Sequence, residues 1–163
     1  MSRRRDVRAR LATAGVPSPD ADASALIAFV AGQQGFDPAL TAEQAARLEE
    51  LVVLRCQRVP LQHLTGVAGF RYLDIAVGPG VFVPRPETEV LVDLALTAPF
   101  ETAIDLCTGS GAVALALATE TGARVVGVEK DPVALSWARR DVGDRVGLLE
   151  AAVCSPSRLP PVD

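Results

Sequence analysis

The sequence is poor in the residues from which many active sites are built. It has one histidine, His63, and three cysteines, Cys56, Cys107 and Cys154, among 163 residues. A single imidazole leaves little material for a metal centre or a Ser-His-Asp triad. Three widely spaced cysteines suit free thiols in a reducing cytoplasm better than a disulfide framework, which needs paired cysteines. We therefore expect a cytoplasmic protein without metal chemistry.

Long apolar runs are also absent. The most suggestive stretch, residues 112–118, is far shorter than the roughly 18 residues that a membrane-spanning helix needs. The basic N-terminus is followed by polar residues, so no signal-peptide core is present. Apolar residues nevertheless make up 49% of the chain, which is enough for a buried core and too many for a disordered chain. We expect a globular protein that makes no membrane contact.

Charge is distributed unevenly along the chain. The net charge is −4, yet residues 1–10 contain five arginines and one aspartate, so this segment carries +4 and the remainder −8. Arginines 3–5, with Arg8 and Arg10, are typical of an arm that contacts RNA, as on a ribosome. The simpler interpretation is a solvated first helical turn, and the sequence leaves both open.

Periodicity divides the chain into four expected segments. The first is helical, the second alternates as a strand hairpin does, the third mixes strands with helices, and the fourth has no periodic pattern. We expect a helical N-terminal domain at 1–58, a β-hairpin linker at 59–86, the first half of a sheet domain at 87–150 and an irregular tail at 151–163.

Helix starts are marked by polar side chains in the first segment. Thr41 with Gln44 has the spacing of a capping box, in which each residue satisfies a backbone amide of the other. Asp20 or Asp22 is a candidate N-cap for the preceding helix. Both patterns predict helices that begin where an orphan backbone amide finds a side-chain acceptor.

Strands and helices alternate in the third segment. Strands are expected at 102–106, 124–129 and 145–150, with helices at 112–121 and 132–140 between them. This order predicts a parallel, doubly wound α/β sheet. Three strands are half of such a sheet, so the first strand, which precedes a glycine-rich turn, is expected at an exposed edge.

The glycine-rich turn is the first candidate site. In Asp105-Leu106-Cys107-Thr108-Gly109-Ser110-Gly111, the glycines allow the backbone to approach a ligand closely where a helix begins. Glu129 ends the next strand, where a carboxylate can accept both ribose hydroxyls of a nucleoside. On the glycines alone, NAD and S-adenosylmethionine are equal alternatives, and a purely structural turn is a third.

Asp105 distinguishes between the two cofactors. A carboxylate four residues before the first glycine would repel the pyrophosphate of a dinucleotide, but it attracts the sulfonium and ammonium groups of S-adenosylmethionine. The competing interpretation is that Asp105 caps a helix. We interpret the turn as part of a site for S-adenosylmethionine.

A second motif, Phe82-Val83-Pro84-Arg85-Pro86-Glu87-Thr88-Glu89, narrows the family. Together with the glycine turn it resembles the HemK-like protein-glutamine N5-methyltransferases, over roughly residues 5–150. The resemblance implies a partial Rossmann-like class I methyltransferase sheet, preceded by a small helical N-terminal domain. It also implies methyl transfer from S-adenosylmethionine to the glutamine of the Gly-Gly-Gln loop of peptide-chain release factors. The expected cofactor-binding residues are Arg85, Asp105, Cys107, Thr108, Gly109, Gly111 and Glu129.

Some residues of this pattern keep two interpretations. Arg85 either meets the carboxylate of the cofactor or pairs with Glu87 or Glu89. Trp137 is expected to pack in the core, with a place beside adenine as the alternative. Cys107 occupies a position in the turn that needs a small residue. Without a nearby base to activate its thiol, it is not expected to act as a nucleophile. The sequence assigns no catalytic residue.

Two elements of the family are missing. Its Asn-Pro-Pro-Tyr motif supplies acceptors for the substrate amide, but this sequence has no asparagine, and its one pair of adjacent prolines is Pro160-Pro161. The acid expected to accept the adenine amino group is replaced by Ala152, with Glu150 two residues earlier. We therefore expect weak or absent methyl transfer by this chain alone. The alternatives are a non-catalytic module that binds release factors or the ribosome, and an NAD-binding oxidoreductase fragment.

Overall fold

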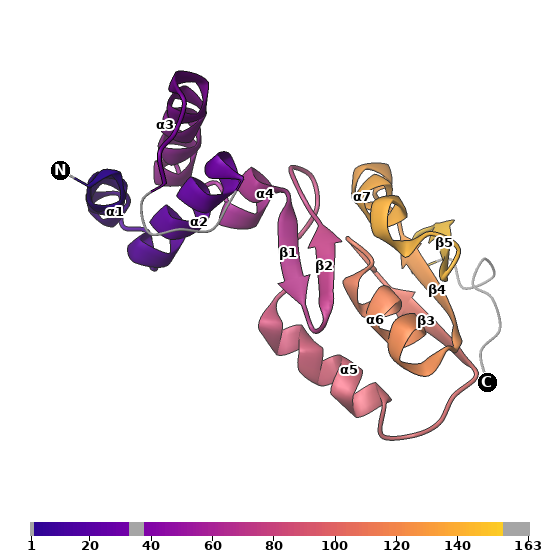
Figure 1. The fold of residues 1–163 in the computed structure, drawn as a ribbon. Coiled ribbons are helices and arrows are strands. Elements are labelled where there is room, and N and C mark those ends of the chain that lie inside the picture. Colours follow the sequence, from indigo (N-terminus) through magenta and orange to yellow (C-terminus); the bar gives the residue numbers. More distant parts are fainter. Residues whose placement is uncertain (1, 33–37, 155–163) are drawn as a thin grey trace. The chain divides into compact units, whose positions relative to one another are not determined.

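The computed structural model describes residues 2–32 and 38–154, and the chain divides into two compact units between Thr65 and Gly66 (Figure 1). Most of the expected tail, including Pro160-Pro161, lies outside the described residues.

The first unit consists of helices whose apolar faces form one core. Its helices are α1 (Arg3–Thr13), α2 (Pro19–Ala31), α3 (Ala42–Cys56) and α4 (Leu61–Thr65). The side chains of Leu11, Leu26, Ile27, Leu51 and Val52 are at most 1% exposed. The helical character of this unit was expected, but α4 was not. It has five residues and directly follows a proline, so it is too short to show helical periodicity.

The start of α3 confirms the predicted capping box. The Thr41 hydroxyl accepts a hydrogen bond from the Gln44 backbone N–H at 3.2 Å, and the Gln44 side chain accepts one from the Thr41 N–H at 2.9 Å. This reciprocal pair satisfies two donors that the first turn of a helix leaves free. The start of α3 is therefore set locally by two side chains.

The prediction that Asp20 or Asp22 caps α2 is wrong. The helix begins at Pro19 after Ser18, so both aspartates lie inside its first turn. A proline at the first helical position already has the required φ, and it lacks one of the backbone N–H groups that the first turn of a helix leaves unpaired. Asp22 is instead buried, and its Oδ2 accepts a hydrogen bond from Nε of Arg55 in α3 at 2.7 Å.

The second unit opens with a hairpin that is tied to two helices. Strands β1 (Val67–Phe70) and β2 (Leu73–Ala76) pair antiparallel, and Arg71 in the turn has φ +53°. The Arg71 guanidinium donates to both oxygens of Glu120 at 2.5 and 2.8 Å and to Asp93 at 2.6 Å. These hydrogen bonds, the Glu120 pair first, raise the pKa of Arg71. The hairpin is followed by a 3₁₀ turn, η1 (Pro86–Thr88), and by α5 (Glu89–Ala95).

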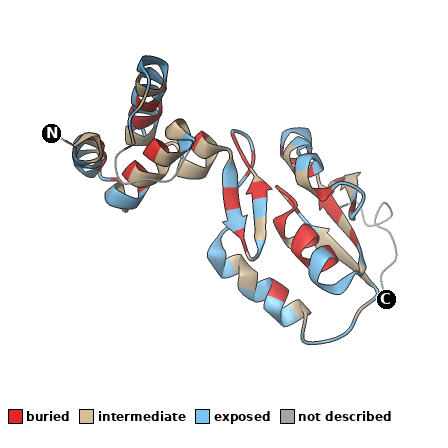
Figure 2. Ribbon diagram, viewed as in Figure 1, coloured by how far each residue is buried: buried red, intermediate tan, exposed pale blue. Residues whose placement is uncertain are grey.

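The centre of the second unit is a parallel sheet. Its strands are β3 (Thr102–Leu106), β4 (Arg124–Glu129) and β5 (Val146–Glu150), in the order β3-β4-β5. They are joined by α6 (Ala112–Thr121) and α7 (Pro132–Val142). The fold-class prediction, a partial α/β sheet preceded in the sequence by a helical N-terminal region, is confirmed. Figure 2 shows α6 largely buried, and five consecutive residues of it, 114–118, are at most 9% exposed.

The sheet order also confirms that the strand before the glycine turn lies at an edge. Within the described residues, β3 pairs only with β4. The carboxyl ends of parallel strands meet at one side of a sheet, where ligands of α/β proteins bind. Asp105 and Glu129 both lie near these ends, in β3 and β4.

Candidate functional site

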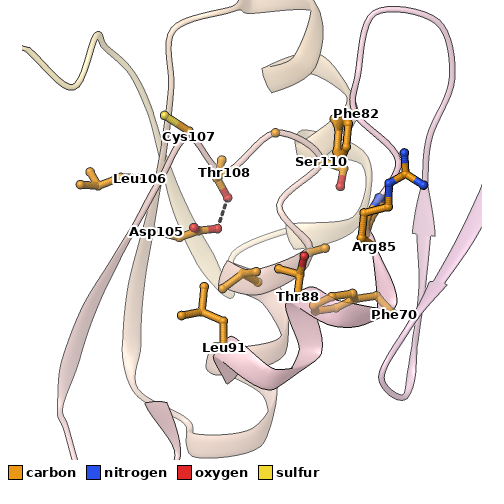
Figure 3. A pocket seen from close by; sticks show the side chains of 14 residues that line it. Phe70, Phe82, Arg85, Thr88, Leu91, Asp105, Leu106, Cys107, Thr108 and Ser110 are labelled. Atoms are coloured by element: carbon orange, nitrogen blue, oxygen red, sulfur yellow. Dashed lines mark hydrogen bonds between the residues drawn. The ribbon is translucent and has the colours of Figure 1, made fainter. Parts of the chain in front are cut away.

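The two sequence motifs meet at one pocket. Residues of the proline-rich segment 82–91 and of the segment 105–113, which contains the glycine turn, line a hollow of about 240 Å³ (Figure 3). Four of the expected ligand-binding residues of the second segment lie on its wall: Asp105, Cys107, Thr108 and Gly109. Arg85 lies there as well. The structure therefore brings together residues that are about twenty positions apart in the sequence.

The glycine turn is shaped by residues with positive φ. Cys107 has φ +63° and Gly109 has φ +56°, while Thr108 between them donates its backbone N–H to the Val128 carbonyl at 3.0 Å. A Cβ built on Gly109 would meet no atom within 4 Å. The glycine is therefore required here for its backbone conformation, and the space beside it is open to a ligand.

Asp105 is held by two donors. Its Oδ2 accepts a hydrogen bond from the Thr108 hydroxyl at 2.6 Å and one from the Ala114 backbone N–H at 3.2 Å. Ala114 lies in the first turn of α6, so Asp105 does satisfy a helix amide, as the capping interpretation held. It also lines the pocket, as the ligand interpretation held. The two roles are compatible because one oxygen accepts both bonds.

The environment of Asp105 opposes its negative charge. Burial raises the pKa of the Asp105 carboxyl above its ordinary value, and the charge of Glu129 raises it further. The hydrogen bonds from Thr108 and Ala114 lower this pKa, but they do not cancel the effect of burial. In the described part of the chain, no lysine, arginine or histidine forms an ion pair with Asp105. A cation beside Asp105 would therefore be stabilised electrostatically.

Glu129 lies at the end of β4 but is not on the pocket wall. Its Oε2 accepts a hydrogen bond from the Gly109 N–H at 3.1 Å, and its Oε1 accepts from the N–H groups of Lys130 and Asp131 at 2.8 and 3.0 Å. Glu129 thus connects the end of β4 to the glycine turn. A ribose hydroxyl that bound Glu129 would share an oxygen with one of these amides.

Gly111 is packed against α7 and does not line the pocket. Its φ is +81°, and a Cβ there would lie 3.1 Å from Val142 Cγ1 and 3.2 Å from Ala138 Cβ, both in α7. This residue lets α6 and α7 approach closely at the start of α6.

Arg85 is exposed, and its guanidinium carbon lies 5.3 Å from the centre of the Phe82 ring. Glu89 is engaged elsewhere, because its Oε1 accepts the backbone N–H of Arg71 at 2.9 Å. In the described part of the chain, Arg85 forms no ion pair with Glu89 or Glu87. The charge of Arg85 is thus available at the mouth of the pocket, above an aromatic ring.

Trp137 packs against the turn that follows the hairpin. Its indole N–H donates to the Pro79 carbonyl at 3.2 Å, and a Cβ on Gly78 would lie 2.3 Å from its Cζ2. Arg140 stacks over the ring at 3.9 Å from its centre. Trp137 is half-buried and packs against the core of the second unit, in line with its packing interpretation, and it does not line the pocket beside the glycine turn.

The end of β5 bears on the expected adenine contact. Glu150 is exposed and lies opposite Glu129 in the β4–β5 ladder, and Ala151 donates its N–H to the Glu129 carbonyl. Ala152 follows immediately and is half-buried. Ala152 therefore lies close to the end of the sheet, but its side chain offers no hydrogen-bond acceptor for an adenine amino group.

The N-terminal arginines divide into two groups. Arg10 binds both oxygens of Glu49 at 2.7 and 2.5 Å, and Arg4 binds Asp20 at 2.6 Å. Arg5 and Arg8 are exposed, and within the described residues neither forms an ion pair. Only part of the +4 charge of this segment is thus left for a partner.

Several residues of the pocket were not expected from the sequence. Phe70 of the hairpin, Thr88 of η1, Leu91 of α5 and Ser110 of the turn all line it. Ser110 is 3% exposed, so it belongs to the floor of the site. The alternating pattern predicted the hairpin but carried no signal for which of its side chains would reach the glycine turn.

Neither a metal-binding cluster nor a membrane-spanning helix is found among the described residues. Among residues 2–32 and 38–154, no three His, Cys, Asp or Glu side chains are grouped so that they could hold a metal ion. No helix in these same ranges combines the length and apolarity that a bilayer crossing demands.

The chain resembles known proteins along most of its length. Residues 4–66 match the family model of the PrmC N-terminal domain. The chain is 50% identical over 149 residues to the release factor glutamine methyltransferase of Streptomyces coelicolor, a match that covers 85% of this chain and 53% of that protein. It is 46% identical over 164 residues to the enzyme of the same name from Mycolicibacterium smegmatis, covering 95% of this chain and 58% of the relative. The expected resemblance to this family is confirmed.

Two further facts accompany these matches. The chain spans between half and three fifths of the length of the relatives named above. Among solved structures, the tRNA (uracil-54, C5)-methyltransferase of Pyrococcus abyssi in complex with S-adenosyl-L-homocysteine has a TM-score of 0.45 at 22% identity, covering 53% of this chain and 23% of that chain.

Proposed function

We propose that this chain is the S-adenosylmethionine-binding part of a release factor glutamine methyltransferase, with Arg85, Asp105, Cys107, Thr108, Gly109, Gly111 and Glu129 as its cofactor residues. The observation that carries the proposal is a pocket that residues of both motifs line together. The identity to relatives of that name, 46% over 164 residues in one case, supports it.

The residues of the pocket fit this cofactor. Asp105 is a partly shielded carboxylate that, in the described chain, has no cationic partner, and the cofactor carries both a sulfonium and an ammonium group. Arg85 at the mouth complements a carboxylate. The hollow of about 240 Å³ is smaller than the roughly 300–1,000 Å³ typical of whole ligand sites, so it fits one part of the cofactor rather than all of it.

The chemistry proposed for the family is mostly positioning. S-adenosylmethionine supplies an activated methyl group, whereas the amide nitrogen of glutamine is a poor nucleophile because its lone pair is delocalised. An enzyme therefore gains most by orienting the amide with hydrogen-bond acceptors. This sequence has no asparagine with which to reproduce the Asn-Pro-Pro-Tyr acceptors. We expect the chain alone to bind the donor and to transfer methyl groups weakly or not at all to a release factor.

Binding and transfer are tested separately. Calorimetry with S-adenosylhomocysteine tests binding, and NAD serves as the control ligand. Binding of S-adenosylhomocysteine without a response to NAD supports the proposal, and the reverse result supports the oxidoreductase alternative. Incubation with labelled S-adenosylmethionine and a release factor tests transfer. Efficient labelling of the release factor would contradict the expected loss of activity.

A second candidate is a non-catalytic module that binds release factors or ribosomes. The exposure of Arg5 and Arg8, without ion pairs in the described part of the chain, favours it. Their charge would give a contact that weakens with salt. A pull-down of ribosomes at low and high salt, with a variant carrying Arg5→Gln and Arg8→Gln, tests this candidate. Retention that is equal for the variant and the unchanged chain would rule out the arginine contact.

A further inference from the structure

The starting point is the hydrogen bond between Thr108 and Asp105 at the pocket wall. The Thr108 hydroxyl donates to Asp105 Oδ2 at 2.6 Å, which is within the range of charge-assisted hydrogen bonds (Figure 3). The Ala114 N–H occupies the same oxygen at 3.2 Å. Both donors thus lie on one side of the carboxylate, and no hydrogen bond within the described chain uses Oδ1.

Thr108 is itself fixed in place. Its side chain is buried, its backbone N–H donates to the Val128 carbonyl at 3.0 Å, and its own carbonyl accepts the Gly111 N–H at 2.8 Å. Gly127 of β4 lies under it, and a Cβ there would come within 3.0 Å of both Thr108 Cγ2 and Oγ1. The bare backbone of Gly127 leaves just the space that the threonine fills. A donor held this tightly determines the orientation of its acceptor.

We propose that Thr108 is a positioning residue that orients the Asp105 carboxylate, so that Oδ1 receives the ammonium group of the ligand and the site selects ligands by that charge. The proposal rests on the proposed function, because it presupposes that the pocket holds the amino-acid end of S-adenosylmethionine or its product. Beyond the proposed function, it states that the site selects ligands by their ammonium group and that Thr108 is the residue on which this selection depends.

The charges around Asp105 agree with this role. Glu129 approaches from the end of β4, Arg85 and the Cys107 thiol line the same pocket, and α6 contributes a backbone N–H from Ala114. In the described residues, the carboxylate is thus stabilised by neutral donors alone. A cationic ligand would be the missing counter-charge.

The first test compares two ligands that differ only at the proposed contact. S-adenosylhomocysteine carries the ammonium group, and its deamino analogue has hydrogen in its place. Calorimetry on the full chain is expected to show a clear preference for S-adenosylhomocysteine. Thr108→Val, which keeps the shape but removes the hydroxyl, should weaken that ligand about 10-fold and the analogue less than about 2-fold. Thr108→Ser, which keeps the hydroxyl, should restore the preference.

The second test uses pH, and its first measurement needs only the unchanged chain. The preference of the unchanged chain for S-adenosylhomocysteine should fall as the pH is lowered, because a protonated Asp105 no longer attracts the ammonium group. In the unchanged chain the hydrogen bond from Thr108 lowers the pKa of Asp105. Thr108→Val removes this bond and so raises the pKa of Asp105, and the fall in preference should begin at a higher pH. Asp105→Asn, measured in parallel, should abolish both the preference and its dependence on pH.

The outcomes separate the two proposals. If the unchanged chain binds neither nucleoside, the proposed function fails and this inference fails with it. If the chain binds both but Thr108→Val weakens them equally, or the preference does not depend on pH, the pocket is a nucleoside site and the role of Thr108 is overturned.

Discussion

Each of the two units holds an aspartate that is at least partly shielded from solvent, and the two differ in what meets the carboxylate. Asp22 in α2 is 7% exposed and is 2.7 Å from Nε of Arg55. Asp105 in β3 meets only a hydroxyl and a backbone N–H in the described residues. A carboxylate paired with a cation is part of the fold. One that is shielded, unpaired and placed on a pocket wall is a candidate contact for a ligand.

The largest expected effect on stability comes from removing the charge of Asp22, and the same change at Asp105 is its comparison. Asp22→Asn leaves the Arg55 guanidinium, whose side chain is 12% exposed, without its counter-charge, so the free energy of unfolding should fall by about 3 kcal/mol. Asp105→Asn should change it by less than about 1 kcal/mol, because the asparagine oxygen still accepts both hydrogen bonds. Urea unfolding, followed by circular dichroism and by Trp137 fluorescence, measures both.

Asp20→Asn is the control for position in α2. Its carboxylate is 59% exposed in the pair with Arg4, so its loss should cost less than about 1 kcal/mol. Equal losses for Asp22→Asn and Asp105→Asn would mean that the carboxylate in β3 is also a structural element, and would remove the contrast between the units.

A smaller loss of stability is expected from a change at Gly127, the glycine that packs against Thr108. Gly127→Ala would place a Cβ 3.0 Å from the Thr108 side chain and 3.1 Å from Leu148 Cδ2, and should lower the free energy of unfolding by about 1–3 kcal/mol. Gly69→Ala is the matched control, since a Cβ on that strand glycine meets nothing within 4 Å. If Trp137 fluorescence reports the same urea midpoint for both variants, Thr108 is not tightly held.

Much of the fold follows from short-range patterns. The strands at 102–106 and 124–129 and the helix at 112–121 have the bounds that their periodicity predicted, and Gly122 ends α6 with φ +73° as a C-cap. The helix at 132–140 runs on to Val142, and the last strand begins at Val146 rather than one residue earlier. These are local properties, which adjacent residues determine.

Contacts between distant residues were not predictable in this way. The sequence marked Asp22 as a cap because caps are local, whereas its actual partner, Arg55, is 33 positions away. The contact of Arg71 with Glu120 spans 49 positions. The glycine turn identified Asp105, but its hydrogen bonds to Thr108 and Ala114 require the helix to fold back beside the strand. The places of Gly111 against α7 and Glu129 against the turn have the same origin.

The pH dependence of stability should differ in sign between the units. The folded-state pKa of Asp105 is raised, so below it the folded chain binds a proton that the unfolded chain lacks. The stability of the second unit should therefore rise as the pH falls through the folded pKa of Asp105, towards the unfolded value near 4. Asp105→Asn should remove this rise, as Trp137 fluorescence in urea at several pH values would show. An identical slope in the variant would assign the effect to another group.

The smallest effect is expected from Glu49, which forms an exposed ion pair with Arg10. Its contribution to stability should depend on pH in the opposite direction to that of Asp105. The hydrogen bond from Arg10 lowers the pKa of Glu49, so its contribution is present above the unfolded pKa and is lost as the pH falls through the folded one. Because the pair is open to solvent, with side chains 34% and 58% exposed, Glu49→Gln should cost at most about 1 kcal/mol at pH 7. Urea unfolding followed by circular dichroism, with and without 1 M salt, checks this. A loss that is unchanged by salt would show that the Arg10–Glu49 contact is shielded like that of Asp22, so that the first unit would depend on its charged pairs even at its surface.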